Sequence, residues 1–354
     1  MTRFFSKKYE SLVPYVPGEQ PQDKKYVKLN TNESPFAPSA AVVEAASGAA
    51  GTLNLYSAPE PTALYEKFAA ATGVKPCELI ATNGSDEALD FAFKAFCDKD
   101  HPAVFPDITY GFYEVFAKAN GVPYRTIPLK DDFTVDPDDY IGASGTVFIA
   151  NPNAPTGISL PLSEIERIVA GNPGNVVVID EAYVDFGGES AVKLINKYEN
   201  LLVTQTFSKS RSLAGARLGF GIACAPLIED LKTLKYSTNP YNVNSMTQRA
   251  GCAALDEPET FEKNCKAIIR NREYLTKKLS GLGFVLTGSS ANFVFAKHPA
   301  IPGEDLYLEL KARGVLIRHF TADRIKDFNR ITVGSTEQID ILIEKTKEIL
   351  GGMK

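Results

Sequence analysis

The sequence contains no tryptophan and only three histidines, and its five cysteines are scattered along the chain. No Cys-x-x-Cys motif and no Cys/His cluster occurs, so neither a disulfide framework nor a zinc site is indicated. There is no apolar run long enough to span a membrane, and the N-terminus lacks the apolar core of a signal peptide. We therefore expect a cytoplasmic protein of a reducing compartment, with no metal and no membrane partner.

An excess of charge of one sign is also missing. Lysine and arginine number 38, aspartate and glutamate number 43, and the two signs are interspersed without a basic stripe. We expect no nucleic-acid partner, because proteins that bind nucleic acids concentrate positive charge on one face. The sequence also lacks the Gly-x-Gly-x-x-Gly and Walker patterns, which disfavours a nucleotide-binding α/β protein.

The chain does contain a regular alternation of strand-like and helix-like segments. Between about residues 40 and 235 this alternation predicts an α/β fold with a mostly parallel central sheet. Beyond a long helical region to about residue 282, shorter strands and helices predict a smaller α+β domain. We expect an N-terminal arm at 1–38, a large domain at 39–245 and a small C-terminal domain at 246–354.

One stretch of the large domain combines a buried strand with reactive side chains. The apolar run that begins at Leu201 ends in Thr206, Ser208 and Lys209, and Arg217 lies eight residues beyond the lysine. Hydroxyls and a guanidinium suit phosphate oxygens, so they could bind one anion. A partly desolvated lysine beside that anion would have a lowered pKa and a free amine for Schiff-base chemistry. The alternative is a solvated lysine and an arginine on a helix surface.

Polar or aromatic side chains follow other expected strands as well. Ser85 and Asp86 begin a helix after the strand at 78–82, where free N–H groups favour an anion; an ordinary N-cap is the alternative. Asp180 ends an apolar strand and needs a cation or a donor there. Because the carboxyl ends of parallel strands meet at one edge, their convergence favours a cofactor site. The residues expected at this edge are Ser85, Tyr110, Asn153, Asp180 and Lys209.

Two arginines of the expected small domain, Arg318 and Arg330, lie in apolar strand contexts. A guanidinium is costly in such a place without an anion. Structural salt bridges are one explanation, and a pair of arginines that binds a charged substrate is the other. Tyr56 lies in a linker between two expected helices, a position typical of a packing residue.

Together these motifs resemble the fold type I pyridoxal-phosphate (PLP) aminotransferases, and within them the histidinol-phosphate aminotransferase family. The resemblance rests on Asn-Gly-Ser-Asp at 83–86, Asp-Glu-Ala-Tyr at 180–183, and Ser-Lys with Leu-Ala-Gly-x-Arg-Leu-Gly across 208–219. It runs nearly end to end, from 13–15 to 330–334. It implies a PLP-dependent enzyme that moves the amino group of L-histidinol phosphate to 2-oxoglutarate in histidine biosynthesis, as a homodimer with shared active sites.

The resemblance also implies roles for the residues at the sheet edge. Lys209 would hold PLP covalently and move protons at the substrate, Asp180 would keep the pyridinium nitrogen protonated, and Tyr183 would donate to the ring oxygen. Tyr110 would stack on the ring. The phosphate would be held by the backbone amides of Ser85 and Asp86 and the side chains of Thr206, Ser208 and Arg217.

Further implied roles concern the substrate and a second subunit. In the family, the tyrosine at the position of Tyr56 reaches the phosphate across a dimer interface. Arg330 would bind the carboxylate or the equivalent end of the substrate. Arg318, Tyr15 and Asn32 would line the end that reads the substrate's phosphate or side chain.

One position departs from the family pattern. The family has Asn directly before Pro-Thr-Gly, in contact with the ring oxygen, and this chain has Ala154 there. Asn153 or Asn151 could take over after a small shift of the turn, or Tyr183 could carry the contact alone; we expect Asn153 at the cofactor. Aromatic-amino-acid aminotransferases and threonine-phosphate decarboxylase-like enzymes share these motifs and are alternatives, as is a ligand-binding protein that keeps the fold without catalysis.

Overall fold

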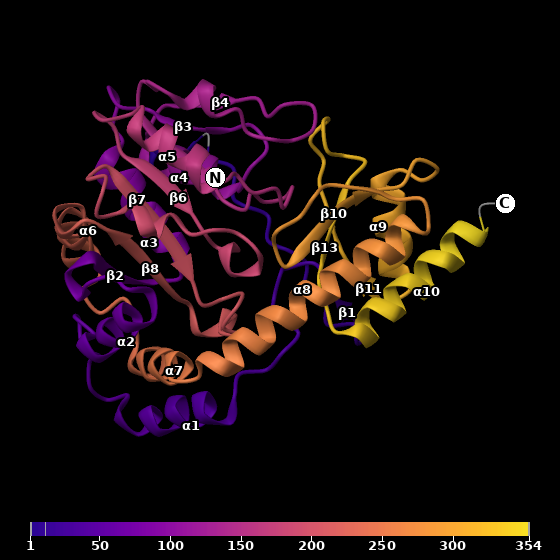
Figure 1. The fold of residues 1–354 in the computed structure, drawn as a ribbon, viewed down its shortest axis with the longest axis horizontal. Coiled ribbons are helices and arrows are strands. Elements are labelled where there is room, and N and C mark those ends of the chain that lie inside the picture. The colour runs from indigo at the N-terminus through magenta and orange to yellow at the C-terminus, as the bar shows by residue number, and fades with distance from the viewer. Residues whose placement is uncertain (1, 11, 353–354) are drawn as a thin grey trace.

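The computed structural model describes residues 2–10 and 12–352 of the chain. Its centre is a seven-stranded sheet in which only one strand, β8, runs antiparallel to its neighbours. The predicted α/β fold with a mostly parallel sheet is therefore confirmed (Figure 1). In sheet order the strands are β2 (Leu79–Asn83), β8 (Leu218–Ala223), β7 (Leu201–Thr206), β6 (Val177–Asp180), β5 (Thr146–Ala150), β3 (Ala103–Pro106) and β4 (Tyr124–Ile127).

Helices cover both faces of this sheet because its strands are apolar on both sides. In β5, Val147 and Ile149 belong to one buried cluster, while Phe148 belongs to the cluster on the opposite face. This alternation follows from the two-residue period of a strand. Helices α3 (Ser85–Phe96), α4 (Phe112–Asn120) and α6 (Ala225–Thr238) contribute to one cluster, and α2 (Thr62–Thr72), α5 (Leu162–Ala170) and α7 (Ser245–Leu255) to the other.

A second, antiparallel sheet lies in the C-terminal part of the chain (Figure 1). Its strands are β12 (Arg318–His319), β13 (Asn329–Thr332), β10 (Phe293–Lys297) and β9 (Val285–Leu286). Its apolar face packs on helices α8 (Pro258–Ser280), α9 (Gly303–Ala312) and α10 (Thr336–Gly352).

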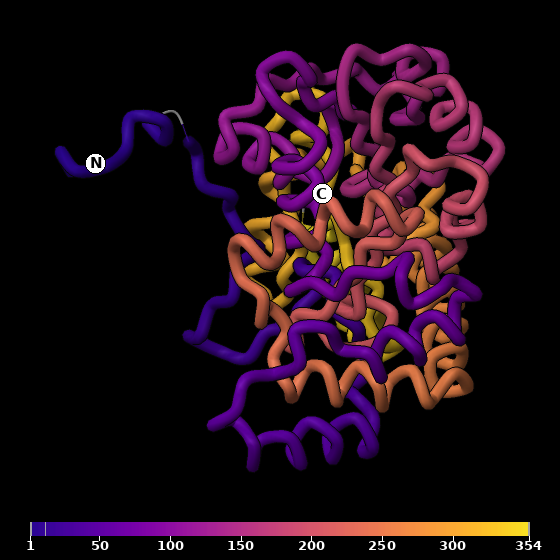
Figure 2. Tube along the Cα trace, turned by 90° about the vertical axis from the view of Figure 1, so that its left-hand side faces the viewer, coloured from indigo at the N-terminus to yellow at the C-terminus, as the bar shows by residue number. Residues whose placement is uncertain are grey.

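The N-terminal arm joins this second part. Strand β1 (Val27–Lys28) pairs in parallel with β11 (Val315–Leu316). Figure 2 shows residues 2–10 extending away from the body of the molecule. Helix α1 (Ala40–Ala49) packs on α7, and α7 contributes Ala250 and Ala254 to the core of the large sheet. The division into 1–38, 39–245 and 246–354 stays a prediction; the packing of α7 favours placing 246–255 with the large domain.

Short 3-10 helices complete the described chain: η1 (Lys7–Tyr9), η2 (Ala50–Thr52), η3 (Pro76–Glu78), η4 (Pro137–Tyr140), η5 (Val184–Phe186), η6 (Ala191–Leu194) and η7 (Ala214–Ala216). Within residues 2–10 and 12–352, no helix combines the length and apolar character that crossing a membrane requires.

Candidate active site

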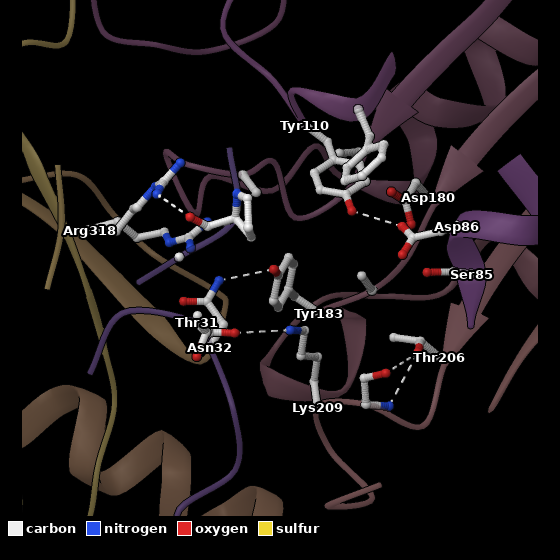
Figure 3. A pocket seen from close by; sticks show the side chains of 18 of the residues that line it. Thr31, Asn32, Ser85, Asp86, Tyr110, Asp180, Tyr183, Thr206, Lys209 and Arg318 are labelled. Atoms are coloured by element: carbon white, nitrogen blue, oxygen red, sulfur yellow. Dashed lines mark hydrogen bonds between the residues drawn. The ribbon is translucent and has the colours of Figure 1, made fainter. Parts of the chain in front are cut away.

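A cavity of about 320 Å³ opens at the carboxyl edge of the large sheet. The N-terminal arm and the second sheet supply its other walls (Figure 3). The structure brings thirteen of the fifteen predicted site residues to its lining, and leaves out Asn153 and Tyr56. Those in the lining are Tyr15, Asn32, Ser85, Asp86, Tyr110, Asp180, Tyr183, Thr206, Ser208, Lys209, Arg217, Arg318 and Arg330.

Lys209 lies just beyond the end of β7 and points into this cavity. Its Nζ donates to the backbone carbonyl of Thr31 at 3.3 Å (Figure 3). Burial and then the nearby positive charge of Arg330 lower the pKa of the lysine to about 8. A substantial fraction of the amine is therefore neutral near pH 8, the form that can act as a nucleophile or accept a proton.

Asp180 is the last residue of β6 and is 5% exposed. Its Oδ1 accepts a hydrogen bond from Thr204 Oγ1 at 3.0 Å, and its Oδ2 accepts one from the Tyr113 hydroxyl at 3.1 Å. Burial raises the pKa of the carboxyl to about 6, although both hydrogen bonds oppose this shift. A positive charge placed beside this buried carboxylate would stabilise its ionised form.

The start of α3 forms one end of the cavity. No side chain caps its first turn, so the N-cap alternative for Ser85 and Asp86 is not observed. Gly84 precedes the helix with a φ of 73°, and a Cβ there would lie 2.5 Å from Arg217 Nη2. At Gly219 a Cβ would lie 2.4 Å from the backbone nitrogen of Ser85. The two glycines thus let Arg217 and strand β8 pack closely against the start of α3. The first N–H groups of a helix have no partner within the helix, and such a position suits a phosphate.

Arg217 reaches this end because β8 is reversed: Gly219 pairs with Thr206 at the end of β7. Its Nη2 contacts Asp86 Oδ2 at 3.0 Å and its Nη1 donates to Ser208 Oγ at 3.4 Å. Thr206 Oγ1 donates to the same serine oxygen at 2.9 Å. The hydroxyls and the guanidinium that the sequence grouped as one anion site therefore lie within hydrogen-bonding distance of one another.

Tyr110 and Tyr183 enter the cavity from different strand ends. The Tyr110 hydroxyl donates to Asp86 Oδ1 at 2.8 Å (Figure 3). The Tyr183 hydroxyl accepts from Asn32 Nδ2 at 3.0 Å, which leaves its own proton free to donate. Asn32 is held in turn by Thr332, whose Oγ1 accepts from the backbone N–H of Asn32 at 2.9 Å and donates to its Oδ1 at 3.1 Å.

The two arginines of the second sheet have different surroundings. Arg330 donates through Nη2 to the backbone carbonyl of Asn30 at 3.2 Å, and its buried Nε has no partner among the described residues. Burial lowers the pKa of this guanidinium, which is consistent with a site for an anion. Arg318 instead donates to the carbonyls of Val16 at 2.8 Å and Pro17 at 3.2 Å, and so holds the arm over the cavity.

Asn153 is buried but does not line the cavity. Its Nδ2 donates to the carbonyl of Ile108 at 3.0 Å, and its Oδ1 accepts from Thr109 Oγ1 at 2.8 Å. Asn151 is occupied as well, by both backbone groups of Leu160. These amides bond to Ile108, Thr109 and Leu160, and the residues of the turn that line the cavity are Pro152 and Ala154.

Tyr56 lies outside the cavity and is 84% exposed. Its ring stacks on Tyr241 with centroids 4.4 Å apart. Leu53, Leu55 and Tyr236 are also exposed. A role for Tyr56 in a site therefore requires the cavity of another chain.

Several cavity-linked residues were not predicted from the sequence. Thr204 lies opposite Asp180 in the register of β6 and β7, so strand pairing could have identified it. Tyr113 comes three residues after Tyr110, in the first turn of α4, but its hydrogen bond to Asp180 depends on the placement of that helix. Thr31, which accepts from Lys209, is a backbone contact and carries no side-chain signal.

Comparisons with known proteins agree with this geometry. The family of class I and II aminotransferases matches residues 24–345. Histidinol-phosphate aminotransferase from Aromatoleum aromaticum is 47% identical over 355 aligned positions, covering 99% of this chain and 100% of the relative. The enzyme of the same name from Brachyspira hyodysenteriae is 46% identical over 352 positions, with 99% of each chain covered. A related crystal structure is that of histidinol-phosphate aminotransferase from Sinorhizobium meliloti in complex with pyridoxal-5'-phosphate. It superimposes with a TM-score of 0.90 at 23% identity and covers 100% of this chain and 99% of that one. This likeness supports the fold.

Proposed function

Since this chain belongs to the family of class I and II aminotransferases, we propose that it transfers the amino group of L-histidinol phosphate to 2-oxoglutarate, a step of histidine biosynthesis. The observation that carries this proposal is the full-length similarity to relatives of that name, joined to a cavity with matching chemistry. The cavity has a helix end without a side-chain cap, with Arg217 on one side, and on the other Arg330, whose Nε has no partner among the described residues. Such a cavity suits a phosphate-bearing cofactor together with an anionic substrate.

We propose PLP as the cofactor, because the residues present fit each of its polar groups. The glycine-lined start of α3 with Ser208 and Arg217 fits the phosphate, and Asp180 fits a protonated ring nitrogen. Lys209, with its lowered pKa, fits the carbonyl that forms the covalent link. When bound, PLP supplies an electron sink for the bond that breaks at the carbon carrying the amino group.

We propose a separate role in the reaction for each side chain that lines the cavity. Lys209 Nζ, oriented by the carbonyl of Thr31, would take a proton from the substrate carbon that carries the amino group and deliver it to the cofactor carbon that receives that group. Tyr183 donates its free proton toward the ring oxygen, because its other hydrogen bond comes from Asn32. Arg330 binds the anionic group of either substrate, and Arg318 with Tyr15 completes the wall formed by the arm.

We propose further that the working unit is a homodimer. Exposed leucines and tyrosines around Tyr56 form an apolar surface of the kind that marks protein contacts. By the resemblance to the family, the Tyr56 of one chain would then reach the phosphate end of the cavity of the other chain. A cytoplasmic location is supported by the five free cysteines, which fit a reducing compartment.

The experiment that tests the function is a substrate series monitored by the visible absorbance of the PLP-loaded protein. L-histidinol phosphate, phenylalanine and glutamate are added separately. We expect a spectral change with histidinol phosphate at low concentration and with phenylalanine only at much higher concentration. The reverse order would identify an aromatic-amino-acid aminotransferase. Release of CO₂ from threonine phosphate, without amino transfer, would identify a decarboxylase.

A further inference from the structure

Tyr113 is a buried tyrosine behind the cavity that is not part of its lining. It lies on α4, and its hydroxyl donates to Asp180 Oδ2 at 3.1 Å. Thr204 on β7, also outside the lining, donates to Asp180 Oδ1 at 3.0 Å. Each carboxylate oxygen thus receives one hydroxyl proton, and two donors on opposite oxygens fix the plane of the carboxylate.

The ring of Tyr113 is held rigidly by other aromatic rings. It meets Tyr110 edge-on at 5.7 Å and 90°, and Phe105 edge-on at 5.7 Å and 61°. Phe148 lies 5.9 Å away in a tilted arrangement. Folding has therefore already restricted the rotamers of Tyr113. Its hydrogen bond to Asp180 costs no further side-chain conformational entropy.

We propose that the hydroxyls of Tyr113 and Thr204 are positioning groups for amino transfer, which act through Asp180. This inference rests on the proposed function, since it assigns Asp180 to the ring nitrogen of the cofactor. Loss of either donor leaves a buried carboxylate short of one hydrogen bond, which favours its neutral form. A neutral carboxyl cannot hold the proton of a ring nitrogen by charge.

The other titratable groups that face Asp180 do not replace these donors. Asp86 on α3 carries the same charge and opposes ionisation of Asp180. Tyr183, which follows β6, accepts from Asn32 and makes no hydrogen bond to Asp180 among the described residues. The remaining donor is the backbone N–H of Ala182.

A matched pair of variants isolates the hydroxyl of Tyr113. Tyr113→Phe removes a buried hydroxyl bonded to Asp180, and Tyr140→Phe removes a buried hydroxyl that has no partner among the described residues. We expect Tyr113→Phe to lower kcat about tenfold, since a hydrogen bond to a charged group contributes about 1.5 kcal/mol or more. In Tyr113→Phe the KM for L-histidinol phosphate should change less than about twofold, because the hydroxyl of Tyr113 does not line the cavity. Tyr140→Phe should keep both constants.

A second measurement uses the protein without cofactor. Carbon-13 NMR of labelled aspartate carboxyls, with the Asp180 signal assigned from Asp180→Asn, follows the titration of Asp180 directly. Tyr113→Phe should move its midpoint to higher pH, and Tyr140→Phe should leave it in place. Thr204→Val should act like Tyr113→Phe, and Thr204→Ser, which keeps the hydroxyl, should restore the wild-type midpoint. If Tyr113→Phe does not fold, the comparison of Thr204→Val with Thr204→Ser still tests the inference.

Equal losses in Tyr113→Phe and Tyr140→Phe, or an unmoved Asp180 midpoint in both Tyr113→Phe and Thr204→Val, would overturn the inference. An inactive wild-type enzyme with L-histidinol phosphate would instead refute the proposed substrate, and the NMR titration would still decide the role of the hydroxyls.

Discussion

Replacing Asp180 by asparagine should stabilise the cofactor-free protein, and the gain should depend on pH. The carboxyl is buried at the end of β6 and its pKa is raised from 3.8 to about 6. Because the folded protein binds this proton more tightly than the unfolded chain, burial costs nothing below about pH 4, where the group is neutral in both states. Above about pH 6 the group is charged in both states, and the full cost of the buried charge is present.

The difference between about 6 and 3.8 corresponds to about 3 kcal/mol at pH 8. Urea unfolding of the cofactor-free wild type and of Asp180→Asn at pH 4.5, 6 and 8 measures this gain. The stability difference between the two proteins should rise toward about 3 kcal/mol as the pH rises. A constant difference at all three pH values would refute the reasoning, because a packing effect does not depend on pH.

An exposed aspartate provides a control of opposite sign. The pKa of Asp132 is lowered by hydrogen bonds from the side chain and backbone of Thr134. Its charge therefore contributes stability that is present above the unfolded pKa and lost as the pH falls. Asp132→Asn should show no gain at pH 8. In the loaded enzyme, Asp180→Asn should instead lower turnover strongly, which separates stability from function.

Three further variants test other parts of the site. Lys209→Ala should abolish turnover while PLP still binds without a covalent link, as borohydride treatment and mass spectrometry will show; appreciable turnover would exclude Lys209 as the proton carrier. Asn153→Ala should destabilise the fold by about 1–3 kcal/mol, since it leaves buried partners unpaired, yet leave the Kd for PLP within about twofold in a fluorescence titration. A large loss of affinity would return Asn153 to the cofactor site. Tyr56→Ala should weaken PLP binding, and mixing it with Lys209→Ala subunits should restore activity in hybrid dimers; no recovery would argue against shared sites.

The sequence alone determined much of the architecture and the position of the main site. The apolar runs at 146–150 and 175–180 predicted buried strands, and their alternation with helical patterns predicted a mostly parallel sheet. Because parallel strands end at one edge, Ser85, Tyr110, Asp180 and Lys209 could be placed together without a structure. These inferences succeed because they depend on local patterns that each segment carries by itself.

The tertiary structure decided the contacts that depend on segments far apart in the chain. The reversal of β8 returns Arg217 to the edge, and the arm brings Asn32 to Tyr183 across 151 residues. The direction of the Asn153 amide follows from the backbone of Ile108, which no spacing in the sequence records. Side-chain type reveals what a residue can bind, but only the packed chain determines which partner lies within hydrogen-bonding distance.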